Sequence, residues 1–197
     1  MIGAEAFIGI TATIFVAELT DKDALLLLAL ATRTQPLRVF LAGAVAFTFT
    51  TPVIVAAGAY AISIVPIIWI KLAGGGVMLA YGAWEAVGAF GQRPVRKEEE
   101  RIERARGELK AFFLMVGALA LLDLAGDATE VLTIVFVAQY SNALLVFTCV
   151  LAGLLAATAV ETSLGNQLKR TLTPERMRYV ATAVFLVLGA TIVATSL

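Results

Sequence analysis

Histidine is absent from this 197-residue sequence, and cysteine occurs once, at Cys149. A single cysteine excludes an intramolecular disulfide, and a metal site of imidazole and thiolate ligands is nearly excluded as well. Charged residues make up only 15% of the chain, with 15 basic and 15 acidic side chains in balance. This balance gives no indication of nucleic-acid binding. No basic segment precedes the first apolar run, so we expect a retained first helix and no cleaved signal peptide.

Apolar residues make up 60% of the chain, and the mean hydropathy is +0.90. A soluble domain of this length could not bury so much apolar surface, whereas a bilayer can accommodate it. Because a spanning helix needs about 20 mainly apolar residues, the chain has room for six spans with short connections. We therefore predict an all-α polytopic membrane protein. The expected spans are residues 6–32, 37–60, 66–90, 111–139, 143–165 and 177–197.

The two halves of the sequence resemble each other. The segment after Pro66 aligns without gaps with the segment after Pro174, at an offset of 108 residues. Asp21 matches Asp127 at an offset of 106 residues, in the same order along the chain. This order indicates an internal repeat of three spans, and an odd number makes the second copy enter the membrane from the opposite side. We predict a first repeat over 1–91, a charged linker over 92–110 and a second repeat over 111–197.

Basic residues are distributed unevenly between the expected loops. All but two of the 15 basic residues follow the first, third and fifth spans, and the exceptions are Lys22 and Lys71. The positive-inside rule places these loops, including the charged linker, in the cytoplasm. Both termini are then expected outside. A wrong span count would scramble this asymmetry, so the asymmetry also supports six spans.

Charged side chains interrupt the first expected span well away from its ends. The segment FVAELTDKDALLLL contains Glu18, Asp21, Lys22 and Asp23. On a regular helix, Glu18, Asp21 and Lys22 would share an arc of about 100°. Asp23 would point elsewhere unless the helix is broken there. Lys22 can offset part of the cost of burial by pairing with Glu18, four residues earlier.

A second acidic cluster lies in the fourth expected span, in the segment LLDLAGDATEVLTIV. Asp123, Asp127 and Glu130 follow one another at spacings of four and three residues. On a continuous helix they would share an arc of about 60°. Gly126 would allow close backbone approach or local unwinding beside them. Each half of the chain therefore places carboxylates inside an apolar helix.

Carboxylates inside a membrane span need a compensating charge, because each costs about 2.5–3.5 kcal/mol at the bilayer centre on insertion scales. The expected spans contain too few basic residues to neutralise them, so a bound cation or protons must do so. Carboxylate, hydroxyl and carbonyl oxygens are hard ligands that suit Ca²⁺, Mn²⁺ or Mg²⁺. Protons compete with a metal for the same oxygens, which is a physical basis for cation/proton exchange. A structural ion-pair network between helices is the alternative.

Two further features lie outside these clusters. Glu161, in the fifth expected span, is either a proton relay or supporting residue, or a side chain near the cytoplasmic end that reaches water. The run Gly74-Gly75-Gly76 lies inside an apolar span. We interpret it as a helix-packing surface and not as a phosphate-binding loop.

The segment AELTDKDALLLLALATRTQPLRVFLAGA resembles the first signature of the Golgi, plastid and bacterial Ca²⁺/Mn²⁺:H⁺ exchangers. These belong to the lysine-exporter-like superfamily of three-plus-three helix transporters, and they carry the motif E-x-G-D-[KR]-[ST] once in each half. Glu18, Asp21 and Lys22 occupy the acidic and basic positions of this motif. Thr20 replaces the glycine of the motif, and Asp23 replaces its serine or threonine.

The second copy of the motif departs further from the family pattern. Asp127 and Thr129 match it, but no basic residue follows Asp127. Leu124 stands where the family has glutamate. Either Asp123, one residue earlier, or Glu130, one turn later, can substitute for this glutamate.

The resemblance implies six helices in inverted repeats and the exchange of Mn²⁺ or Ca²⁺ for protons, with no permanently bound cofactor and no enzymatic activity. It implies export or homeostasis of the cation in a prokaryotic plasma membrane. In our transporter hypothesis, rocking of the two halves gives alternating access. The oligomeric state stays open. The expected metal ligands are Glu18, Asp21, Asp127, Asp123 and Glu130. The supporting or proton-path residues are Thr20, Lys22, Asp23, Thr129 and Glu161.

Two other functions remain open alternatives. The first is a passive divalent-cation channel, although an inverted repeat with paired acids favours a carrier. The second is an intramembrane aspartyl protease with Asp21 and Asp127 as its dyad. Such proteases carry Tyr-Asp on one helix and Gly-x-Gly-Asp on the other. Here Thr20 precedes Asp21, and Leu124 replaces the first glycine.

Overall fold

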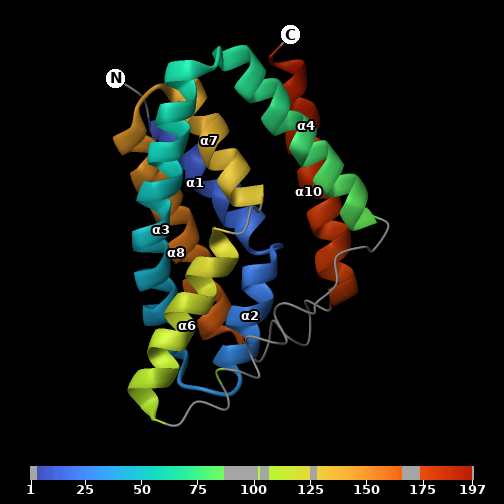
Figure 1. Cartoon of the computed structure of the whole chain (residues 1–197). Coiled ribbons are helices and arrows are strands. Elements are labelled where there is room, and N and C mark those ends of the chain that lie inside the picture. Colours follow the sequence, from blue (N-terminus) through green and yellow to red (C-terminus); the bar gives the residue numbers. More distant parts are fainter. Residues whose placement is uncertain (1–3, 87–101, 103–106, 125–127, 166–173, 197) are drawn as a thin grey trace.

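The computed structural model describes residues 4–86, 102, 107–124, 128–165 and 174–196, and the regular structure in these ranges is all helical (Figure 1). The helices of the first half are α1 (Ala4–Glu18), α2 (Lys22–Ala31), α3 (Pro36–Ile64) and α4 (Ile67–Ala86). Those of the second half are α6 (Glu108–Asp123), α7 (Ala128–Tyr140), α8 (Ala143–Ser163) and α10 (Pro174–Ala194). The predicted all-α class is confirmed.

Each predicted span corresponds to one helix or to two short helices separated by a break. α3, α8 and the Ile67–Trp84 part of α4 are long and apolar enough to cross a membrane alone. α6 and α7, bent by 61° at the break between them, make a fourth if the pair is counted as one span. α1 and α2 make the equivalent broken pair in the first half, and the apolar part of α10 covers Thr182–Ala194. This layout is consistent with six spans, three in each half.

Local signals set where several helices begin. Pro36 lies in the first turn of α3, and Pro174 is the first residue of α10. Proline suits this position because its missing N–H would have no partner there and its φ is already helical. Before α8, Ser141 has a positive φ of 49°, and the Asn142 side chain accepts a hydrogen bond from the Leu145 amide at 3.0 Å. This cap satisfies one amide at the start of α8.

The loops after the first and third spans lie at the same end of the molecule. An ion pair joins Arg38, at the start of α3, to Glu108, at the start of α6, with 2.9 Å between Nη1 and Oε1. The beginning of α1 and the end of α10 lie toward the opposite end (Figure 1). This is the arrangement that an even number of spans requires.

The helices of the two halves are interleaved. α1 packs along α8, and α6 packs along α3, so each broken pair lies against the second span of the other half. α3 and α8 also contact each other. By contrast, α3 and α4 of the same half barely touch. The two halves are therefore not separate bodies, and the predicted rocking of one half against the other does not fit this packing.

α4 and α10 form a closely packed pair that stands beside the other helices (Figure 1). Glycines allow this approach: a Cβ atom at Gly189 would lie 2.9 Å from the Gly75 carbonyl oxygen, and one at Gly75 would lie 2.7 Å from a methyl of Val193. Gly74 faces Val135 of α7. The predicted packing role is thus confirmed at two positions of the glycine run.

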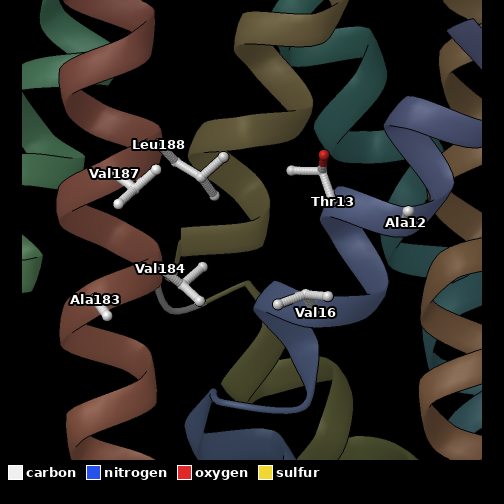
Figure 2. Close-up of a pocket in the computed structure, with 7 residues that line it drawn as sticks. All are labelled: Ala12, Thr13, Val16, Ala183, Val184, Val187 and Leu188. Atoms are coloured by element: carbon white, nitrogen blue, oxygen red, sulfur yellow. The ribbon is translucent and has the colours of Figure 1, made fainter.

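A groove of about 470 Å³ lies between α10 and α1 (Figure 2). Apart from one threonine, its lining is apolar. The lining residues are Ala12, Thr13, Val16, Ala183, Val184, Val187 and Leu188. α10 therefore contacts α1 less closely than it contacts α4.

Candidate functional site

The first acidic cluster lies at a break between two helices. α1 ends at Glu18, α2 begins at Lys22, and three residues connect them. The Thr20 amide donates to the Ala17 carbonyl at 3.1 Å, and the Asp21 amide donates to the Glu18 carbonyl at 3.0 Å. Each bond spans three residues instead of four, which tightens the last turn and ends the α-helical ladder. The predicted helical arc shared by Glu18, Asp21 and Lys22 is therefore wrong.

All three acids of the first cluster are buried, with exposed fractions of 1% for Glu18, 5% for Asp21 and 1% for Asp23. Each interacts with another group inside the protein. Asp23 lies in the first turn of α2, where the helix dipole stabilises a negative charge. Thr20 is half-buried, and its hydroxyl donates to the last turn of α1 at 2.8 Å. The side chain of Lys22 lies outside the described part of the structure.

The second acidic cluster also lies at a break. α6 ends at Asp123, and α7 begins at Ala128, so the three acids do not share one α-helix, and of the two possibilities that Gly126 left open the interruption holds. Thr129 is buried and Glu130 is half-buried, both in the first turn of α7. Asp127 lies outside the described residues, and its place in the site stays a prediction.

Asp123 occupies the structural position that Glu18 occupies in the first half. Each is the last residue of the first helix in its broken pair, and each is 1% exposed. Glu130 lies beyond the break and keeps partial exposure. Of the two substitutes that the sequence left open for the family's glutamate, the structure favours Asp123.

Glu161 of α8 is completely buried, with an exposed fraction of 0%. Neither of its carboxylate oxygens has a hydrogen-bond partner within the described ranges. α8 packs against both α1 and α2, and Asp21 lies close enough for its charge to act on Glu161. The alternative in which Glu161 reaches water is therefore wrong. A second-half acid instead joins a first-half acid at the first break.

Buried threonines occur on the helices that follow or pack against the two breaks. They are Thr50 and Thr51 on α3, Thr129 and Thr133 on α7, and Thr158 and Thr162 on α8. Except for Thr129, each donates its hydroxyl proton to a carbonyl one turn earlier, as Thr158 does to Leu154 at 2.8 Å. Such a hydroxyl oxygen keeps lone pairs that can bind a cation. Of this set, only Thr129 was expected at the site, although the spacing of four residues in Thr129 and Thr133, and again in Thr158 and Thr162, is a signal present in the sequence.

The structure assembles only part of the expected site. Asp21 and Glu161 come together, but no group of three or more acidic or cysteine side chains converges as a metal site in the portion of the chain that is described. Asp127 is not in that portion. The available donors are carboxylate and hydroxyl oxygens, which suit a hard divalent cation and bind protons as well.

Two helical repeats, each with a helix broken at buried acids, define the class of membrane-embedded secondary transporters. A family model described as divalent cation/proton antiporter GDT1 matches residues 6–93 and 111–197. The chain belongs to this family, so the resemblance seen in the sequence is confirmed. Because the family description is that of a transporter, it favours the exchanger over the protease. No curated protein and no solved structure matches the chain.

Proposed function

We propose that this protein exports Mn²⁺ or Ca²⁺ in exchange for protons across a prokaryotic plasma membrane. The observation that carries the proposal is the burial of acids at two equivalent helix breaks in a chain of the antiporter family. Buried carboxylates need a compensating charge, and a transported cation or proton supplies one that can leave.

The proposed cation ligands are carboxylates at the two breaks. Asp21 and Glu18 would bind the cation from the first break, Asp127 would bind it from the second, and Asp123 and Glu130 would complete the shell. Burial of Glu18, Asp21 and Asp123 supports this assignment, because water competes poorly for a cation in such a site.

The proposed supporting residues lie beside these acids. Thr20 and Thr129 would add hydroxyl oxygens, Asp23 would add negative charge, and Lys22 would limit the repulsion between the acids. Glu161 would act as support or on the proton path. Because protons and the metal bind the same oxygens, loading one ion releases the other, and this competition couples their movements.

The proposed orientation places both termini outside and the charged linker over 92–110 in the cytoplasm. The distribution of basic residues supports this orientation through the positive-inside rule. The Arg38–Glu108 ion pair is consistent with this topology, because it joins the starts of α3 and α6, which the proposal places on one side of the membrane.

Reconstitution in liposomes tests the proposal. Purified protein should move Mn²⁺ or Ca²⁺ when a proton gradient is imposed, and a pH-sensitive dye should report proton movement in the opposite direction. Asp21→Asn should abolish both movements. Transport that survives Asp21→Asn would contradict the site assignment, and single-channel currents would indicate a passive channel instead.

A binding titration tests the coupling separately. Affinities for Mn²⁺, Ca²⁺, Mg²⁺ and Fe²⁺ should be measured at several pH values. We expect the affinity for the transported cation to fall as the pH is lowered, because protons occupy the same oxygens. An affinity independent of pH would contradict exchange by competition.

A further inference from the structure

Glu161 is an acid that the twin motifs do not contain. It lies on α8, well after the second motif in the sequence, and it is completely buried. Burying a carboxylate without partners is costly, so a buried acid is normally hydrogen-bonded, paired or bound to a cation. Both oxygens of Glu161 lack a hydrogen-bond partner among the residues that the structure describes.

The hydroxyl groups nearest in sequence do not supply the missing hydrogen bonds. Thr158, one turn before Glu161, donates to the Leu154 carbonyl at 2.8 Å. Thr162, the next residue, donates to the Thr158 carbonyl at 2.7 Å. Both hydroxyls direct their protons to the backbone and present oxygen lone pairs to their surroundings. The surroundings of Glu161 on its own helix are therefore rich in acceptors and suit a cation.

Asp21 brings a second negative charge to the same place. Its charge acts on Glu161, and two carboxylates that interact in a medium of low dielectric repel each other. A divalent cation between them would turn this repulsion into two attractions and leave the group neutral. A monovalent cation would leave one negative charge uncompensated, so the pair favours a divalent ion.

The packing of the helices places this pair across the two repeats. α8 of the second repeat packs against α1 and α2, which flank the first break. The equivalent helix of the first repeat, α3, packs against α6 and α7 at the second break. Val39-Phe40 of α3 matches Val146-Phe147 of α8 at an offset of 107 residues, and at this offset the residue of α3 that corresponds to Glu161 is Ile54. The extra acid therefore belongs to the first break alone.

We propose that Glu161 is a direct ligand of the transported divalent cation and that it binds this cation together with Asp21. This inference rests on the proposed function and adds a ligand from outside the family motif. A cation held in this way joins the first break to α8, so its binding links one repeat to the other.

Direct binding of Mn²⁺ to the purified full-length protein tests this proposal without requiring transport. Free Mn²⁺ is measured by electron paramagnetic resonance during a titration. Glu161→Gln should weaken binding by at least about tenfold, since loss of even an outer-shell partner often costs that much. Glu161→Asp should recover part of the affinity, because it keeps the charge with a shorter reach.

A matched control is Glu108→Gln, which makes the same change in an acid that is 77% exposed. It should bind Mn²⁺ like the wild type. The Asp21→Asn, Glu161→Gln double variant should lose little more affinity than the worse single variant, because the two ligands act as a unit. Thermal unfolding without metal should show Glu161→Gln at least as stable as the wild type, since one of two repelling charges is removed.

Wild-type affinity in Glu161→Gln would overturn the inference. A loss of affinity together with lower stability of the metal-free protein would also overturn the inference. In that case the Glu161 carboxylate would stabilise the fold by pairing with a positive charge of the protein, and not by binding the transported cation. If Asp21→Asn abolishes binding and transport while Glu161→Gln leaves both unchanged, the proposed function stands and this inference fails. If the wild type neither binds nor moves Mn²⁺ or Ca²⁺, both fail.

Discussion

Glu18 and Asp123 lie where a carboxylate does little for helix stability. Each ends a helix, and the last carbonyl groups of a helix carry a partial negative charge without intrahelical partners. Electrostatics favours a cation at such a position, not an acid. A carboxylate beside these carbonyls gives a cluster of oxygen atoms with strong negative potential. A bound cation, as proposed above, would account for the placement of both residues.

This equivalence predicts which acid of the second cluster matters most. Asp123→Asn should lower the initial rate of Mn²⁺/H⁺ exchange in liposomes by about tenfold or more, because it removes a charge next to the break. Glu130→Gln should have a smaller effect, since Glu130 is only half-buried beyond the break. Equal amounts of each variant must insert and elute as the wild type does. A larger loss in Glu130→Gln would reverse the assignment.

At the scale of helices, hydropathy predicted the spans well. The predicted span 37–60 corresponds to α3, and 143–165 corresponds to α8, because a bilayer demands long apolar segments with little ambiguity. The helix break at 19–21 was not predicted, because no proline or glycine lies there. An unbroken helix would also have put Glu18 and Asp21 on one face, so the spacing of the acids did not require a break. For the second break, Gly126 indicated that the helix could unwind locally.

The pairing of Asp21 with Glu161 could not be predicted from the sequence. The electrostatic interaction between Asp21 and Glu161 joins residues of different repeats, and it depends on α8 packing beside the first break. Spacing along the chain carries no information about that packing. By contrast, Glu18, Asp21 and Asp123 could be found because acids inside apolar segments stand out against their background.

The packing of α1 on α8 gives a prediction at the same scale. A Cβ atom at Gly153 would lie 2.8 Å from the Thr11 carbonyl oxygen and 2.9 Å from Ile14 Cβ. Because backbone cannot move aside easily, Gly153→Ala should destabilise the protein by about 1–3 kcal/mol. It should also weaken Mn²⁺ binding, since α1 carries the first break. Unfolding in detergent and a metal titration measure the two effects.

Gly117→Ala is the control for this change. Gly117 lies in α6, and a Cβ atom there would meet nothing within 4 Å. Alanine has the higher helix propensity by about 1 kcal/mol, so this variant should be neutral or slightly more stable. Similar losses in both variants would show that the close approach of α1 to α8 is unimportant.

At the scale of the whole molecule, the helices form two packed groups, and these groups do not coincide with the two sequence repeats. α1, α2, α3, α6, α7 and α8 form one packed group, and α4 and α10 form the other. The α4–α10 pair contacts the larger group mainly through α4 on α7, while an apolar groove lies between α10 and α1 (Figure 2). Alternating access requires two bodies that move relative to each other. On the basis of this packing, we propose that these bodies are the larger group and the α4–α10 pair.

Cross-linking across the groove tests this division. Val16 of α1 and Val184 of α10 both line the groove, so cysteines at these positions, in a Cys149→Ala background, can be joined by a cleavable bifunctional thiol reagent. We expect cross-linking to stop Mn²⁺/H⁺ exchange in liposomes and cleavage to restore it, because the link fixes α10 against α1. The control is Thr11→Cys with the native Cys149, which joins α1 to α8 inside the larger group, where the Thr11 hydroxyl donates to the Cys149 carbonyl at 3.2 Å. A disulfide there should leave exchange intact. If the control disulfide stops exchange and the link across the groove does not, the moving boundary lies between α1 and α8 and the division proposed here is wrong.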